Sequence, residues 1–233
     1  MAIIFHPQLN RKGLIFIKIP RTAGGFVKKV LYHAAEKTRY LKQEPENRSL
    51  SSGYYGRTGL RRRLQYPLDN YQLCTVIRNP YDRFISSLAY YSNGLGKSFE
   101  EDFLHNSKLG ISSIRNLKNA ISKKNPAQFK HYQKHIFVEQ SKFLGGLKNK
   151  NIRVLSFENI NEEVIDFINE INLDASDLVG GLKDKSINKF GYSKDRKHFT
   201  EYYTAETKQY VETLFPNDFN LLPYDMKWKA DNE

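Results

Sequence analysis

The hydrophobic pattern of the chain alternates between short apolar runs and longer segments with helical spacing. Three runs rich in β-branched residues, at 14–19, 72–78 and 152–157, predict buried strands. Each is followed by apolar positions at helical spacing, which predict helices at about 25–37, 80–91 and 162–171. Because strands that alternate with helices form parallel sheets, the pattern predicts an α/β fold with a small parallel central sheet flanked by helices.

The rest of the pattern is less regular. Further helices are predicted at about 99–106 behind Ser98, at about 127–144, and from Thr204 to Phe215, while Asn161 is the predicted cap of the 162–171 helix. Residues 107–126 are polar and mixed, so no helix is predicted there. Residues 38–70 form an irregular connection with a short helix around 57–64, and the tail frays from about 227. The length of 233 residues suits a single domain spanning 1–233.

The net charge of the chain limits the kinds of partner that it is expected to bind. There are 37 Lys and Arg against 25 Asp and Glu, a net charge of +12, which favours an anionic partner such as a nucleotide, an acidic polymer, nucleic acid or a membrane surface. The single cysteine, Cys74, lies in an apolar run and excludes both an intrachain disulfide and a Cys-x-x-Cys zinc site. The N-terminal apolar run is too short for a signal peptide, and no stretch reaches the roughly 18 apolar residues of a membrane span. We therefore expect a cytoplasmic protein.

The first candidate site follows the first predicted strand. The strand stops at Pro20, a turn of small residues runs from Thr22 to Gly25, and a helix begins. Backbone N–H groups and the helix dipole can hold an anion at such a turn. A double glycine also turns corners in proteins that bind nothing there, so this stretch alone leaves both interpretations open.

The second candidate follows the second strand. Arg78 ends that strand, and Ser86 lies about two turns into the next helix, so a guanidinium and a hydroxyl can hold one phosphate together. Both candidates leave strands at the carboxyl edge of the sheet, where ligands bind in α/β folds. The alternative is that Arg83 pairs with a carboxylate and Ser86 is only a small helix residue. The Gly96-Lys97-Ser98 sequence is no Walker loop, because Tyr91 stands where that pattern needs glycine.

Taken together, the two segments resemble a known family. Ile-Pro-Arg-Thr-Ala-Gly-Gly, at 19–25, is similar to the 5′-phosphosulfate loop of the sulfotransferases, and Arg78-x-Pro-x-x-Arg-x-x-Ser86 is similar to their 3′-phosphate motif. Residues 139–144, 154–159 and 193–204 also resemble stretches of the carbohydrate sulfotransferases of bacterial and Golgi type, the sulfotransferase 2 group. The resemblance spans about residues 12–225 and implies a P-loop-NTPase-like sulfotransferase fold.

The resemblance implies a reaction and a set of roles. The reaction is transfer of a sulfuryl group from 3′-phosphoadenosine 5′-phosphosulfate (PAPS) to a carbohydrate hydroxyl, which leaves adenosine 3′,5′-bisphosphate (PAP) and needs no metal. The basic run 61–63 suits an acidic glycan as acceptor. The implied cofactor-binding residues are Arg21, Thr22, Ala23, Gly24, Gly25 and Phe26 around the phosphosulfate, Arg78 and Ser86 on the 3′-phosphate, and Lys194 and Arg196 closing over the cofactor.

Two departures from the family pattern concern the chemistry. Most relatives carry Lys where this chain has Arg21, whose guanidinium stabilises negative charge but is no proton donor near neutral pH. Many relatives also place a base between the two motifs. Here Glu44 and Glu46 are the candidates in the connection, His131 and His135 are others further along, and His33 is interpreted as structural.

The sequence therefore supports three functional hypotheses. The leading hypothesis is a carbohydrate sulfotransferase. The second is a degenerate sulfotransferase fold that binds nucleotide without transfer, suggested by Arg21 and the lack of an obvious base. The third is a nucleic-acid-binding protein, suggested by the net charge and the 15 tyrosines. It is the weakest, because no helix-turn-helix, zinc or RNP-type signature accompanies them, so no nucleic acid is expected.

Overall fold

The computed structural model describes residues 2–7, 12–38, 41–43, 67–93, 110–124, 133, 135–144, 151–173 and 198–221. Contacts divide the chain into two compact units. Unit 1 comprises Met1–Arg78 and Ser141–Lys189, and unit 2 comprises Asn79–Gln140 and Phe190–Glu233. The single domain spanning 1–233 therefore stays a prediction. The helices predicted at 57–64 and 99–106 and the tail from 227 lie outside the described residues.

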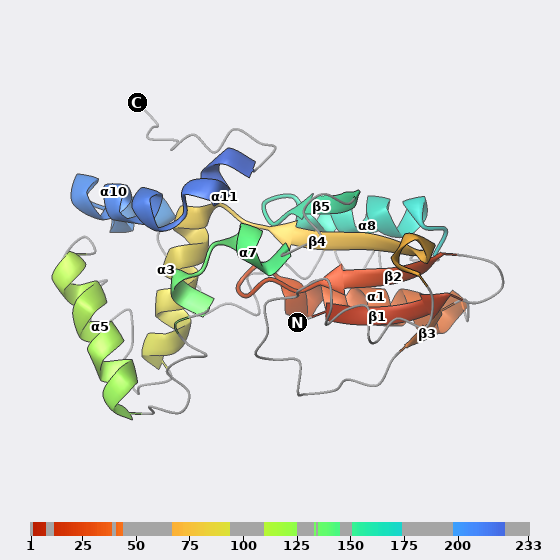
Figure 1. Cartoon of the computed structure of the whole chain (residues 1–233), viewed down its shortest axis with the longest axis horizontal. Helices are drawn as coiled ribbons and strands as arrows, with labels where there is room; N and C mark the ends of the chain where they lie inside the picture. The colour runs from red at the N-terminus through yellow and green to blue at the C-terminus, as the bar shows by residue number, and fades with distance from the viewer. Residues whose placement is uncertain are drawn as a thin grey trace. The chain divides into compact units, whose positions relative to one another are not determined.

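Unit 1 is built on a five-stranded sheet with the strand order β3-β1-β2-β4-β5 (Figure 1). The strands are β1 (Ala2–Pro7), β2 (Gly13–Ile17), β3 (Leu41–Gln43), β4 (Tyr71–Ile77) and β5 (Ile152–Ser156). β2, β4 and β5 are parallel, which confirms the predicted small parallel sheet. β1 and β3 extend it antiparallel and were not predicted: the apolar run of β1 was considered only as a targeting signal, and β3 is too short to show alternation.

Both faces of β2 and β4 are buried, whereas β5 is only half-buried from Ile152 to Val154. On one face Phe16, Cys74 and Leu155 pack in a cluster with apolar residues of α1 (Gly24–Thr38) and α8 (Ile160–Glu170). On the other face Ile15 and Leu73 pack with residues that include Leu68, from the short 3₁₀ helix η2 (Leu68–Asn70), and Leu144. Burial on two sides explains why β2 and most of β4 are apolar runs rather than alternating ones.

The start of α8 corrects one expectation. Asn159, not Asn161, occupies the N-cap position, and its carbonyl accepts the N–H groups of Glu162 and Glu163. The Asn159 side chain makes no capping hydrogen bond. The helix therefore begins two residues earlier than predicted, because Ile160 belongs to its buried face.

Unit 2 is helical in its described residues. It contains α3 (Pro80–Asn93), α5 (Ile111–Lys124), the 3₁₀ helix η5 (Phe199–Tyr202), α10 (Ala205–Leu214) and α11 (Pro216–Leu221) around a core rich in aromatic side chains. α3 and α10 confirm the helices predicted at about 80–91 and from Thr204 to Phe215, and the Thr204 hydroxyl caps α10 by accepting the Thr207 N–H at 3.2 Å. α5 and α11 were not predicted. Among the described side chains of α5, Ile114 and Leu117 are the buried ones, and the many polar positions of this helix hide its periodicity.

The predicted helix at 127–144 is not continuous where the structure describes it. Residues 135–137 are helical, the chain bends at Val138, and a separate short helix α7 (Gln140–Leu144) follows. The cause is a buried polar cluster described below. No helix in the described part of the chain is both long and apolar enough to span a membrane.

Candidate active site

Three segments meet at the carboxyl edge of the parallel strands in unit 1. The β2–α1 loop, residues 18–23, leaves β2, and the Thr75 hydroxyl on the neighbouring strand donates to the Ile17 carbonyl at 2.8 Å. Arg78 follows β4 directly. Phe157 follows β5, and its N–H donates to the Ile77 carbonyl at 2.8 Å. The shared edge brings the loop, Arg78 and Phe157 together, as the parallel topology predicts.

The backbone of the β2–α1 loop is strained. Arg21 has φ 66° and Ala23 has φ 58°, both in the left-handed region that L-residues avoid at a cost of about 1–2 kcal/mol. Thr22 is fully buried between them, and its hydroxyl donates to the Ile19 carbonyl at 3.0 Å. The N–H groups of Phe26 and Val27 both donate to the Ala23 carbonyl, at 2.8 and 3.1 Å. Such strain is typical of functional loops held by their surroundings.

The two glycines at the start of α1 play different roles. A Cβ on Gly24 would lie 2.5 Å from Cγ of Lys18, so only glycine fits there without moving that side chain. A Cβ on Gly25 would meet nothing within 4 Å, and this residue is exposed. A helix that begins at Gly24 offers no carbonyl partner to the N–H groups of Gly24 and Gly25, and its first turn carries no acidic residue. The helix start is therefore open to an anion at Gly25.

Arg78 joins the two motifs. Its Nη1 donates to the Arg21 carbonyl at 3.0 Å, and its Cζ lies 3.9 Å from the centre of the Phe157 ring. Only 6% of Arg78 is exposed. The residue predicted to bind the 3′-phosphate thus also holds the strained loop predicted to bind the 5′-phosphosulfate.

The other predicted site residues are distributed as follows. Ser86 is buried on α3. Because Arg78 belongs to unit 1 and Ser86 to unit 2, their joint contact with one phosphate stays a prediction. Glu44, Glu46, His131, Lys194 and Arg196 lie outside the described residues. His33, half-buried on α1, and His135, half-buried in unit 2, are described but not tested as bases.

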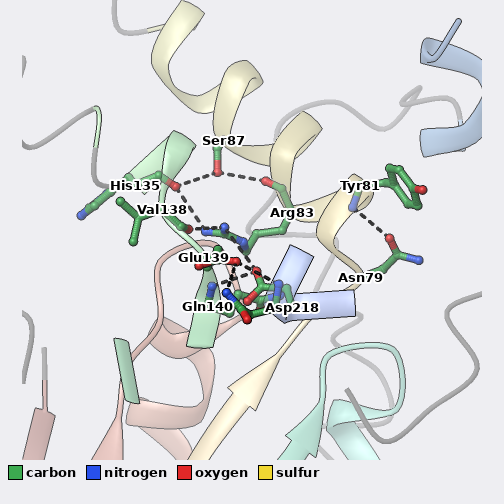
Figure 2. Close-up of polar contacts among 10 residues, drawn as sticks. Asn79, Tyr81, Arg83, Ser87, His135, Val138, Glu139, Gln140 and Asp218 are labelled. Atoms are coloured by element: carbon green, nitrogen blue, oxygen red, sulfur yellow. Dashed lines mark hydrogen bonds and ion pairs between the residues drawn. The ribbon is translucent and has the colours of Figure 1, made fainter. Parts of the chain in front are cut away.

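Arg83, in the same motif as Arg78, lies in a buried polar cluster and contacts other groups of the protein (Figure 2). It is fully buried in unit 2, its Nη2 donates to the Val138 carbonyl at 2.6 Å and its Nη1 to the His135 carbonyl at 3.4 Å. Nη2 also lies 4.0 Å from Oδ2 of Asp218, and Cζ lies 5.0 Å from the Phe215 ring centre. The alternative that Arg83 pairs with a carboxylate is therefore confirmed.

The Arg83 cluster also breaks the predicted 127–144 helix. Asp218 accepts the Gln140 N–H at 2.8 Å, so this N–H bonds outside the helix. The buried carboxylate of Glu139 accepts the backbone and side-chain N–H groups of Asn217, at 2.9 and 2.8 Å. The Val138 carbonyl accepts from Arg83 in the same way. The chain bends here because its backbone polar groups bond to side chains instead of to one another along a helix (Figure 2).

The first turn of α3 is anchored in unit 2 as well. The Tyr203 hydroxyl, in the stretch that resembles the late cofactor loop, donates to the Tyr81 carbonyl at 2.9 Å. The Tyr81 hydroxyl donates to Glu212 at 2.5 Å. Burial first, and the Glu212 carboxylate second, raise the pKa of Tyr81 far above its usual range. The end of the late loop stretch is thus fixed to the helix that carries Ser86.

Sequence reasoning missed two residues of this edge. Phe157 lies in the stretch 154–159 that resembles the family, but the sequence assigns it no role. Its contact with the guanidinium of Arg78 is visible only in the structure. Lys18 was counted as part of the strand, which ends at Ile17. Within the described residues, no group of three or more His, Cys, Asp or Glu side chains is placed to hold a metal ion.

Comparison with known proteins identifies the class. The sequence profile of the sulfotransferase family matches residues 9–225, which is nearly the whole chain. A search of curated proteins found no match, and a search of solved structures found none. The chain belongs to the sulfotransferase family, so it is an enzyme of sulfuryl transfer with an acceptor substrate, and its α/β architecture agrees with that assignment. Enzymes of this family generally use PAPS and release PAP.

Proposed function

We propose that the protein transfers the sulfuryl group of PAPS to a hydroxyl of a carbohydrate and releases PAP. The observation that carries this proposal is the strained β2–α1 loop at the start of α1, with its Arg21 carbonyl held by the guanidinium of Arg78. The chain belongs to the sulfotransferase family, and the loop and Arg78 lie in the two segments that resemble the cofactor motifs of that family. Their direct hydrogen bond supports one nucleotide site built from both.

The residues of this edge fit a nucleotide with two anionic ends. The start of α1 at the exposed Gly25 and the guanidinium of Arg21 suit the 5′-phosphosulfate, since helix N-termini and cations both favour anions. The guanidinium of Arg78 has its Cζ 3.9 Å from the centre of the Phe157 ring, and a guanidinium is suited to bidentate contact with the 3′-phosphate. In this proposal Thr22, Ala23, Gly24 and Phe26 shape the loop, and Ser86, Lys194 and Arg196 are further cofactor-binding residues.

The chemistry resembles phosphoryl transfer. The acceptor oxygen bonds to sulfur while the bond from sulfur to the phosphate oxygen breaks, and positive charge stabilises the leaving oxygen. Arg21 supplies that charge without giving a proton. Glu44 or Glu46 takes the acceptor proton in this scheme, with His131 and His135 as alternatives. The carbohydrate acceptor, acidic in character, rests on the family resemblance and the basic run 61–63, and the cytoplasm is the proposed location.

One experiment tests the proposal. The purified chain is unfolded thermally with and without PAP, then incubated with sulfur-labelled PAPS and a panel of neutral and acidic glycans. At about 100 times its dissociation constant, PAP should stabilise the protein by roughly 2.7 kcal/mol, and label should appear on at least one glycan. No shift with PAP would refute the nucleotide site.

The same experiment distinguishes an active sulfotransferase from the second candidate function, nucleotide binding without transfer. A protein that binds PAP but labels no acceptor is a degenerate sulfotransferase fold, the alternative favoured by Arg21 in the strained loop. The variant Arg21→Lys then decides whether the substitution is the cause. Transfer that appears only in Arg21→Lys would show that the arginine disables the loop.

A further inference from the structure

A side chain of α8 closes the end of β5, the last strand in the order of the sheet. Successive N–H groups of a strand point to opposite sides, and the Phe157 N–H donates to Ile77 of β4. The Ser156 N–H therefore points away from β4, and a buried N–H needs a partner. Its partner is Oε2 of Glu163, in the first turn of α8, at 2.9 Å. Ser156 is only 7% exposed, so this hydrogen bond is shielded from water.

The turn between β5 and α8 is held by further hydrogen bonds on both sides of Phe157. The Ser156 hydroxyl donates to Oε2 of Glu158 at 2.8 Å and accepts the Glu158 N–H at 3.2 Å. The Phe157 N–H donates to the Ile77 carbonyl at 2.8 Å, and the Phe157 carbonyl accepts the Ile160 N–H at 3.4 Å. Both polar groups of the Phe157 backbone are thus bonded, and its position follows from the turn.

The turn determines what lies against Arg78. Ile77 directly precedes Arg78, so the hydrogen bond from Phe157 to Ile77 joins the two segments next to the guanidinium. The half-buried Phe157 ring packs against the core shared by α1 and α8, and its centre lies 3.9 Å from Cζ of Arg78. A guanidinium that already lies on a fixed ring loses less rotamer freedom when it binds an anion.

We propose that Glu163 is a positioning residue of the 3′-phosphate site. It holds the end of β5 and so fixes Phe157, and through Phe157 it fixes the guanidinium of Arg78. This inference rests on the proposed function, and Glu163 has no contact with the nucleotide in it. The role needs an oxygen that accepts the Ser156 N–H, and it does not need the negative charge.

Two ligands and three variants isolate this role. Glu163→Ala should raise the dissociation constant for PAP, measured by calorimetry, about two- to fivefold, the effect expected from losing the ring face under Arg78. Its affinity for adenosine 5′-monophosphate, which lacks the 3′-phosphate, should not change. Glu163→Gln should bind PAP like the wild type, because its amide oxygen accepts the same N–H. Glu162→Ala, at an exposed position of the same turn, is the matched control and should bind both ligands normally.

A double-mutant cycle tests whether Glu163 acts through Phe157. In a protein that already carries Phe157→Leu, Glu163→Ala should weaken PAP binding no further, because the ring that it positions is gone. Thermal unfolding without ligand checks that each variant folds. If Glu163→Ala does not fold, Ser156→Ala takes its place in the cycle, since it removes the two hydroxyl hydrogen bonds to Glu158 from the same turn.

The outcomes distinguish this inference from the function on which it rests. The inference is overturned, and the proposed function stands, if Glu163→Ala binds PAP as well as Glu162→Ala does. Equal losses for both ligands, or the same loss of PAP affinity with and without Phe157→Leu, would overturn it as well. If the wild-type protein does not bind PAP, the proposed function fails and the inference fails with it.

Discussion

Two buried arginines of one sequence motif lie in different units and have different partners. Arg83, in unit 2, is fully buried, and its guanidinium is engaged by two main-chain carbonyls, a carboxylate and an aromatic ring. Arg78, in unit 1, stands at the carboxyl edge of the sheet, on the face of Phe157 and against the β2–α1 loop. The difference indicates that one sequence motif contains both a residue at the candidate site, Arg78, and a residue buried in the core of unit 2, Arg83.

The largest effect is expected at Arg83. Arg83→Leu should lower the free energy of unfolding by about 3–5 kcal/mol, because it leaves Asp218 as a buried charge and two carbonyls without their donor. Chemical denaturation measures it. Arg115→Leu, at an exposed position of α5, is the matched control and should change stability by less than about 0.5 kcal/mol. An equal, small loss in both variants would show that the Arg83 cluster is not structural.

Arg78 should behave in the opposite way, with binding as the main loss. Arg78→Ala should weaken PAP binding by at least about tenfold, since it removes a charged donor worth about 1.5–3 kcal/mol to an anion. Calorimetry measures this directly. Arg153→Ala removes the same charge from another residue of unit 1, one in an exposed ion pair with Glu170, and should bind PAP normally. Similar affinity in the two variants would place the 3′-phosphate elsewhere.

Tyr81 tests the anchoring of α3 through pH. The raised pKa means that the folded state keeps the phenol protonated while the unfolded chain loses the proton near pH 10. Stability from this group is therefore fully present below pH 10 and declines as the pH rises above it. Tyr81→Phe should cost about 0.5–1.5 kcal/mol at pH 8 and flatten the decline above pH 10. An identical alkaline decline in both proteins would contradict the assignment.

The smallest effect is expected at Phe157, which acts on binding only through Arg78. Phe157→Leu removes the ring face under the guanidinium, an interaction worth about 0.5–1 kcal/mol, so PAP affinity should fall by roughly two- to fivefold. Phe157→Tyr keeps the ring and serves as the control. A loss as large in the tyrosine variant would point to altered packing of β5 rather than to lost support of Arg78.

The same contrast explains what the sequence could and could not predict. β2, β4 and β5, and the helices after them, follow from local periodicity, and the strand order places the loop and Arg78 at one edge. The pairing of Arg83 was foreseen as an alternative, but its partner was not, because Asp218 lies far along the chain. The break at Val138 escaped prediction for the same reason: it depends on side chains of α11, a helix that was itself unpredicted.

The candidate catalytic residues were less predictable from the sequence than the candidate cofactor-binding residues. Arg21 is visible in the sequence as a departure, but its left-handed backbone is visible only in the structure. The position of Lys18 over Gly24 has no sequence signature, since it depends on the geometry of the loop. Glu44 and Glu46 lie outside the described residues, so the base stays a prediction.

A crystal structure of the protein with PAP tests the central claim most directly. The account predicts the 5′-phosphate at the start of α1, against the N–H groups around Gly25, and the 3′-phosphate on the guanidinium of Arg78 above Phe157. Arg83 should keep its bonds to the Val138 carbonyl and Asp218. A nucleotide bound away from the β2–α1 loop, or one contacted by Arg83 instead of Arg78, would contradict it.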